Sequence, residues 1–187
     1  IASTKNTILL SPTGTGKTLA FLLPLLSTLN PDNEEIQALI IVPTRELVLQ
    51  IKKEVEILCK YLSVEVVGVY GGTNIRTQKD LVYASHDILV ATPGRLLDLA
   101  LSRALKLNFI KTLVIDEFDE MLNLGFRAQL TSILDLLPKK RQSLLFSATM
   151  SEASQKVVDD FFISPELVEV ARHGTPLDQI HQVAYAA

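Results

Sequence analysis

The sequence predicts an α/β fold in which a mostly parallel β-sheet carries helices on both faces. Short apolar runs rich in β-branched residues alternate along the chain with longer amphipathic stretches, as they do in successive β-α units. The short runs are apolar at nearly every position, which is typical of strands buried between two layers of helices. No internal repeat and no low-complexity segment interrupts this alternation.

The apolar runs and the amphipathic stretches give the expected elements in order. The strands are expected at residues 7–10, 38–42, 64–70, 87–91, 112–115, 143–146 and 167–170. The helices are expected at residues 17–29, 45–62, 74–85, 96–101, 126–136 and 152–162. The second helix is the clearest, because Leu47, Ile51 and Val55 recur on one face. Pro24 lies inside the first helix and should kink it or end it early.

Length and composition indicate one folded domain with a substantial core. The chain has 187 residues, of which 48% are hydrophobic and 21% charged. Residues 19–26, the longest apolar run, contain Pro24 and are too few to span a bilayer, so no membrane association is expected. A single cysteine, Cys59, excludes a disulfide framework and favours a reducing compartment, the cytoplasm or, in a eukaryote, also the nucleus. The formal charge of −3 means that a bound polyanion would need a local basic patch. A monomer is expected.

A glycine-rich loop after the first strand is the strongest functional signal. Its residues are Ser11, Pro12, Thr13, Gly14, Thr15, Gly16, Lys17 and Thr18. Gly14 and Gly16 let backbone N–H groups turn toward a phosphate, and the following helix points its positive end at the same place. Lys17 would then reach the outer phosphates, and the Thr18 hydroxyl would ligate Mg²⁺. Ser11 stands where the usual pattern has glycine, and a simple turn that caps a helix is the alternative.

The parallel sheet predicts where the other polar segments gather. All strands of such a sheet end at one edge, and ligands bind in the crevice outside those carboxyl ends. Polar or glycine-bearing segments follow the first six strands, at residues 11–18, 43–46, 71–72, 92–95, 116–119 and 147–149. We therefore expect six segments to meet along one rim.

Asp116 and Glu117 are the most informative of these rim residues. They follow the buried run at residues 113–115, where one carboxylate could face the metal ion of a nucleotide and the other the attacking water. We assign Asp116 to the metal and Glu117 to the water. Taken alone, the acidic cluster also suits a solvated turn, and Asp119 also suits a helix N-cap.

The remaining rim segments are individually weak. Thr44 suits an N-cap, Gly71 and Gly72 suit a turn, residues 92–95 suit a proline-containing loop, and residues 147–149 suit the approach to a helix. Their hydroxyls, glycine N–H groups and the guanidinium groups of Arg45 and Arg95 also suit a sugar-phosphate backbone. No aromatic residues alternate with them, so base stacking is not indicated.

Together these segments carry a family resemblance. In chain order they read Thr13-Gly14-Thr15-Gly16-Lys17-Thr18, Pro43-Thr44-Arg45-Glu46-Leu47, Gly71-Gly72, Thr92-Pro93-Gly94-Arg95, Asp116-Glu117-Phe118-Asp119 and Ser147-Ala148-Thr149. This ordered set resembles the N-terminal RecA-like domain of a DEAD-box RNA helicase, over nearly the whole chain. The resemblance implies that the loop residues, Asp116 and Glu117 bind and hydrolyse MgATP. It implies that RNA contacts Thr44, Arg45, Gly71, Gly72, Thr92, Gly94 and Arg95, and that Asp119, Ser147 and Thr149 couple hydrolysis to strand separation.

The resemblance also implies how the chain is organised. Residues 1–170 are expected to form the RecA-like domain, and residues 171–187 a linker toward a second RecA-like domain that would complete the catalytic site. An adenine-reading segment is expected ahead of Ile1, and this chain alone is expected to be nearly inactive. Phe118 stands where the family has alanine, and we expect it to pack differently without disturbing the carboxylates.

Other classes of protein share parts of this pattern. A small-molecule kinase or a GTPase would also use the phosphate loop, but the chain has no Asn-Lys-x-Asp motif for guanine. A DNA translocase, and a partner-binding scaffold without catalysis, remain the alternatives to the RNA helicase. His86, His173 and His181 lack the spacing of metal ligands and are interpreted as surface or structural residues.

Overall fold

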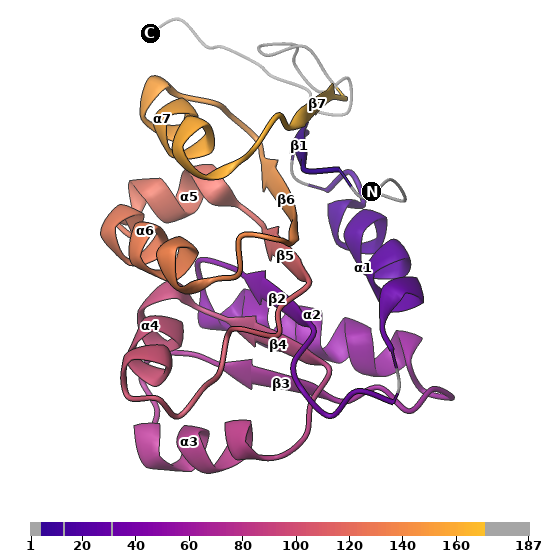
Figure 1. Cartoon of the computed structure of the whole chain (residues 1–187). Coiled ribbons are helices and arrows are strands. Elements are labelled where there is room, and N and C mark those ends of the chain that lie inside the picture. Colours follow the sequence, from indigo (N-terminus) through magenta and orange to yellow (C-terminus); the bar gives the residue numbers. More distant parts are fainter. Residues whose placement is uncertain (1–4, 13, 31, 171–187) are drawn as a thin grey trace, which may run out of the picture.

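The computed structural model describes residues 5–12, 14–30 and 32–170. These residues form a seven-stranded sheet in the order β3-β4-β2-β5-β6-β1-β7, with every neighbouring pair parallel (Figure 1). The strands are β1 (Thr7–Leu10), β2 (Ala38–Ile41), β3 (Val66–Val69), β4 (Ile88–Ala91), β5 (Thr112–Ile115), β6 (Gln142–Ser147) and β7 (Glu166–Glu169). All seven predicted strands are therefore present; β1 and β5 have the predicted bounds, and the ends of the others shift by at most two residues.

The helices follow the predicted order, with one short addition. They are α1 (Lys17–Thr28), α2 (Arg45–Leu58), α3 (Ile75–Tyr83), α4 (Pro93–Leu101), α5 (Phe118–Asn123), α6 (Arg127–Leu136) and α7 (Glu152–Phe161). Residues 92–95 were expected to form a loop, but α4 already begins at Pro93, because proline suits the first helical position, where its missing N–H costs nothing. None of the helices in the described ranges is both long and apolar enough to cross a membrane.

Pro24 does not end α1 early, so that half of the expectation, a kink or an early end, is wrong. The helix continues to Thr28 with Pro24 inside it. Phe21 and Leu22 before the proline and Leu25 after it are all buried against the sheet. We attribute the continuation to this packing on both sides of Pro24, which offsets the roughly 3 kcal/mol that an interior proline costs.

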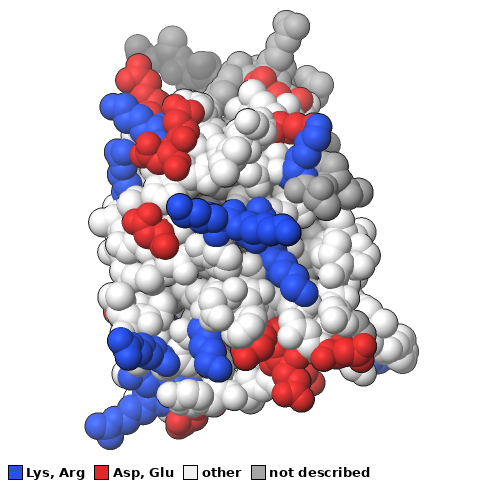
Figure 2. Space-filling view, in the orientation of Figure 1, with Lys and Arg blue, Asp and Glu red and all other residues white. Residues whose placement is uncertain are grey.

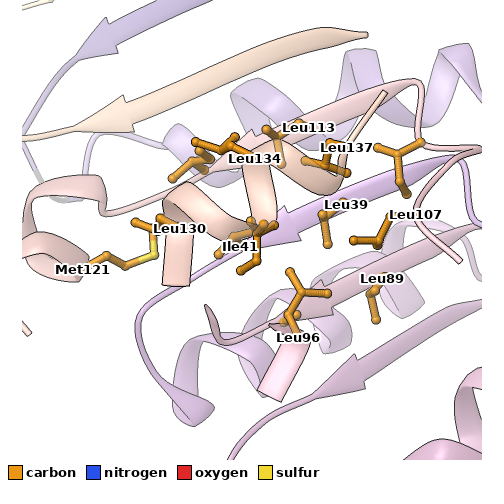
Figure 3. Packing of buried hydrophobic residues seen from close by; sticks show 14 of the residues in the cluster. Leu39, Ile41, Leu89, Leu96, Leu107, Leu113, Met121, Leu130, Leu134 and Leu137 are labelled. Atoms are coloured by element: carbon orange, nitrogen blue, oxygen red, sulfur yellow. The ribbon is translucent and has the colours of Figure 1, made fainter. Parts of the chain in front are cut away.

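The sheet separates two apolar layers, as predicted for strands that are buried on both faces. Ala38 and Ile40 of β2 pack with α1 and α2, whereas Leu39 and Ile41 pack with helices α3 to α7. Figure 3 shows the second layer, in which strand and helix side chains meet. Phe118 is fully buried in this layer, so it is a core residue, as expected for a packing variant.

Candidate functional site

The glycine-rich loop connects β1 to α1 at the carboxyl edge of the sheet. Gly14 and Gly16 have φ angles of +83° and +82°, a left-handed conformation that glycine adopts without strain. The backbone N–H of Ser11 donates to the carbonyl of Ser147 at 3.0 Å, which fixes the start of the loop beside the end of β6. Thr13, also predicted to belong to the loop, lies outside the described residues.

A backbone carbonyl of the loop holds the Lys17 side chain against it. Lys17 is the first residue of α1 and is 9% exposed, and its Nζ donates to the carbonyl of Ser11 at 3.1 Å. The Ser11 and Thr15 hydroxyls lie 2.6 Å apart, and the Thr15 hydroxyl donates to the Pro12 carbonyl at 3.0 Å. Ser11 therefore contributes a hydroxyl that bonds within the loop and that glycine would lack. Thr18 follows Lys17 in the first turn of α1.

Asp116 and Glu117 follow β5 with unusual local geometry. Asp116 is 5% exposed, and its Oδ1 accepts the N–H of Glu117 at 2.9 Å. Burial raises the pKa of Asp116 to about 6, although the positive charge of Lys17 and the Glu117 N–H act in the opposite direction. Glu117 has a φ of +53°, a conformation that costs a non-glycine residue energy and that is concentrated at functional sites.

A hollow of about 420 Å³ joins these segments at the carboxyl edge. Its lining residues are Lys17, Thr44, Leu47, Glu117, Asp119, Glu120 and Ala148. The glycine-rich loop, the acidic turn and the turns after β2 and β6 therefore meet, which are four of the six segments that the parallel topology predicted to gather. Residues 71–72 and 92–95 do not line this hollow. Lys17 also lies close enough to Asp116 to influence its ionisation.

The oxygen donors at this rim fit a magnesium ion that arrives with a nucleotide. The Asp116 carboxylate and the Thr18 hydroxyl are hard oxygen ligands of the kind that Mg²⁺ prefers. Among the described residues, no group of three or more His, Cys, Asp or Glu side chains could hold a metal ion. Mg²⁺ is commonly held by one or two carboxylates together with water and substrate phosphates, so a small donor set is appropriate.

Asp119 links α5 to the turn after β6. Its Oδ2 accepts both the N–H and the hydroxyl of Thr149 at 2.9 Å. The Ser147 hydroxyl donates to the Thr149 carbonyl at 2.6 Å and accepts the Asp119 N–H at 3.3 Å. Partial burial alone would raise the pKa of Asp119, but these hydrogen bonds together lower it below its usual value. The N-cap alternative for Asp119 is wrong. The N-cap position of α5 is Glu117, whose side chain makes no capping hydrogen bond.

Thr44 and Arg45 stand at the start of α2. The Thr44 hydroxyl accepts the Leu47 N–H at 3.3 Å, so the N-cap interpretation of Thr44 is confirmed. The guanidinium carbon of Arg45 lies 5.0 Å from the centre of the Tyr70 ring, within the range of a cation–π interaction. Arg45 remains exposed, so its guanidinium group stays accessible to solvent while it lies over the Tyr70 ring.

Arg95 has partners that the sequence did not reveal. Its guanidinium donates to the Gln78 side-chain oxygen at 2.6 Å and to the Thr73 carbonyl at 2.9 Å. Gln78 in turn donates to the Thr73 hydroxyl at 2.7 Å and to the Tyr70 carbonyl at 3.2 Å. This network fastens the turn containing Gly71 and Gly72 to the start of α4.

Gln78 and Thr73 were missed as site residues. A signal for Gln78 exists, because it shares the spacing of Ile75 and Val82 and thus falls on the inner face of α3. A polar residue at such a position must find a partner when buried, and Gln78 is 5% exposed. Gly72 has a φ of +80°, which allows the tight turn after β3.

Comparison with known proteins decides the family. The family model described as "DEAD/DEAH box helicase" matches residues 1–157. The chain belongs to this family. The resemblance to DEAD-box helicases that the sequence indicated is thus confirmed.

Individual DEAD-box relatives cover most of the chain. The "DEAD-box ATP-dependent RNA helicase CshA" of Streptococcus pneumoniae TIGR4 is 46% identical over 167 residues, which is 89% of this chain and 32% of the relative. That of Bacillus subtilis is 41% identical over 180 residues, 96% of this chain and 36% of the relative. The chain therefore spans about a third of the length of the curated relatives it matches.

A solved structure confirms the fold. The crystal structure of a DEAD box protein from the hyperthermophile Methanococcus jannaschii aligns with a TM-score of 0.86 and 35% identity. The alignment covers 89% of this chain and 46% of that chain. The α/β architecture is thus the RecA-like fold of DEAD-box proteins.

Proposed function

We propose that this chain is the nucleotide-binding domain of an ATP-dependent RNA helicase. The parent protein would couple ATP hydrolysis to unwinding of RNA duplexes or remodelling of ribonucleoproteins. The observation that carries the proposal is the shared hollow, where Lys17 of the phosphate loop and Glu117 of the acidic turn line one space. The names of the CshA relatives favour RNA over DNA as the polymer, and ATP as the nucleotide.

In this proposal residues 11–18 cradle the phosphates of ATP. The loop would offer N–H groups at its two left-handed glycines, while Lys17 moves its ammonium group from the Ser11 carbonyl to the outer phosphates. Thr18 and Asp116 would hold Mg²⁺, which when bound offsets the charge that develops on the phosphoryl group. Glu117 would orient the attacking water and accept its proton.

The turns next to this hollow would form the RNA track and the coupling element. The proposed RNA contacts are Thr44, Arg45, Gly71, Gly72, Thr92, Gly94 and Arg95. Because Arg95 is held by Gln78 and Thr73, we propose that it acts largely by fixing the conformation of the turn that contains Gly71 and Gly72. The bonds among Asp119, Ser147 and Thr149 would transmit nucleotide state to the RNA track.

The remaining proposals concern the parent protein. Residues 1–170 would form the RecA-like domain, and residues 171–187, outside the described residues, would lead to a second RecA-like domain. That domain would supply the cationic groups that stabilise charge during hydrolysis. We further propose a monomer that works in the cytoplasm, with RNA as its partner.

Two variants in the full-length protein test the proposal together. Lys17→Ala should abolish ATP binding, because it removes the cation that meets the phosphates. Glu117→Gln should retain ATP binding but lose RNA-stimulated hydrolysis, because the amide cannot accept a proton. Calorimetry and an ATPase assay with RNA, with DNA and without polymer measure both effects. ATP affinity that is unchanged in the Lys17 variant, or parental turnover in the Glu117 variant, would refute the assigned roles.

A further inference from the structure

A group of basic residues gathers at the edge of the sheet opposite the proposed ATP site. Lys111 immediately precedes β5, while Lys139, Lys140 and Arg141 form the turn between α6 and β6. We call these four residues the amino-edge cluster. Figure 2 shows a band of Lys and Arg side chains across the middle of this face, in front of the region where Figure 1 places β5 and β6. In a chain with a formal charge of −3, such a local concentration of positive charge is notable.

Three residues of the amino-edge cluster border a hollow. The hollow has a volume of about 640 Å³. It is lined by Lys111, Lys140 and Arg141 together with Thr28, Leu29, Gln37, Thr112 and Gln142. This volume falls within the range of roughly 300–1,000 Å³ that is usual for sites that bind small molecules. The cations therefore border a concave space of ligand size.

Within the described residues none of these cations forms an ion pair, although Asp135 and Asp160 line a neighbouring hollow together with Lys139 and Arg141. The ion pairs of the described part of the chain join Lys5 to Glu166, Lys52 to Glu56 and Lys106 to Glu35. Arg141 donates through Nη1 to the Pro138 carbonyl at 2.6 Å, while its buried Nε has no hydrogen-bond partner among the residues that the structure describes. Burial also lowers the pKa of Arg141, which indicates that water solvates this guanidinium poorly.

The hollow is separate from the proposed ATP site. Thr112 and Gln142 are the first residues of β5 and β6, whereas the ATP site lies beyond the last residues of the same strands. A strand of four residues spans roughly 13 Å, so one bound nucleotide at the phosphate loop would not fill both spaces. The cluster is therefore not explained by the ATP-binding function.

The chemistry of the lining favours a small phosphorylated anion. A guanidinium group presents a planar fork that matches phosphate oxygens, and ammonium groups add point charges. None of the described residues that line the hollow is aromatic, so stacking of bases from single-stranded RNA is not supported. We propose that the hollow bordered by Lys111, Lys140 and Arg141 is a second anion site that takes a small molecule bearing a diphosphate group.

Titration with inorganic pyrophosphate tests this site. The chain should carry Lys17→Ala, so that the phosphate loop does not compete for the probe. Backbone amide NMR signals of Thr112 and Gln142 should shift in a saturable manner, while signals near Thr18 stay unchanged. Changing Lys111, Lys140 and Arg141 together to Gln should weaken pyrophosphate binding by about tenfold or more, because charge-assisted hydrogen bonds are lost.

A control variant separates a specific site from general electrostatics. Lys53→Gln, Lys60→Gln and Lys156→Gln together change the net charge equally at exposed positions on α2, after it and on α7. The control should bind pyrophosphate as the Lys17→Ala chain does, and circular dichroism should show that both variants fold. If the triple cluster variant unfolds, the exposed Lys140→Gln change alone should still weaken binding measurably.

Several outcomes would overturn the proposal. Binding that does not saturate, or that falls equally in the control variant, would mean that the hollow is not a site. A decauridylate RNA or a hexaglutamate peptide that binds the hollow more tightly than pyrophosphate would assign it to a macromolecule instead. None of these outcomes depends on whether the phosphate loop binds ATP, because the loop is disabled in every arm.

Discussion

At the scale of single residues, the buried carboxyl group of Asp116 works against the stability of the ligand-free domain. Its pKa rises from an ordinary 3.8 to about 6 because burial penalises its charged form. The folded chain therefore binds more protons than the unfolded chain between about pH 4 and pH 6. Stability is thus lost as the pH rises through this window, and the loss persists at neutral pH.

Replacing this carboxyl group should consequently stabilise the ligand-free chain. Asp116→Asn should increase the free energy of unfolding at pH 7.5 by on the order of 1–3 kcal/mol and change it little at pH 4. Urea denaturation at both pH values in the presence of EDTA measures the effect. Asp135→Asn, on the exposed side of α6, is the control and should show no such pH dependence. An Asp116 variant that is less stable at both pH values would contradict this account.

The same residue shows what sequence can and cannot predict about a site. That Asp116 and Lys17 come together followed from parallel strands that end at one edge. That Glu117 takes a left-handed backbone did not follow, because a non-glycine residue adopts it only when its surroundings impose it. The proximity of Asp116 and Lys17 could thus be predicted from the sequence, whereas the strained backbone of Glu117 could not.

At the scale of secondary-structure elements, side-chain bonds between distant segments fix the rim. Asp119 bonds to Thr149, and Arg95 bonds to Gln78, across 30 and 17 positions of sequence. Hydrophobic periodicity predicted the strands and helices, but it carries no information on which strands become neighbours. Because β4 lies between β3 and β2, α3 and α4 follow adjacent strands, and this order brings Arg95 to Gln78. The partners could therefore not be assigned before the strand order was known.

The bridge between α3 and α4 can be tested through Gln78. Gln78→Leu keeps the size of the side chain but removes an acceptor from Arg95, whose buried Nε already has no partner in the described part of the chain. We expect a loss of about 1–3 kcal/mol in the free energy of unfolding, because the guanidinium loses a buried partner. The full-length protein should also bind RNA more weakly while its ATP affinity is unchanged.

A matched glutamine elsewhere provides the control for that experiment. Gln155 is exposed on α7 and bonds only locally, to Asp159 one turn away. Gln155→Leu should change stability by no more than about 0.5 kcal/mol and leave RNA binding intact. If the two variants behaved alike in urea denaturation and RNA titration, the bridge would have no special role.

At the scale of the whole molecule, the two outermost strands of the sheet differ in how far they are buried. β3 and β7 are the outermost strands. Helices α2 and α3 pack against β3, and all of its residues except Gly68 are buried. Every residue of β7 is exposed, although β7 pairs in parallel with β1. Both strands are therefore outermost in the sheet, but only β3 is buried.

This difference predicts how the domain opens. Amides of central strands such as Ile40 in β2 and Val114 in β5 should exchange with solvent only on global unfolding, because both faces of these strands are buried. Amides of β7 should exchange at least about a hundredfold faster through local opening, since few apolar contacts hold that strand. Amides of β3 should exchange as slowly as those of the central strands if burial, rather than an outermost position in the sheet, sets the exchange rate. Hydrogen exchange followed by NMR distinguishes these cases. Equal protection of Val168 in β7 and Val67 in β3 would show that strand pairing alone holds the edges closed.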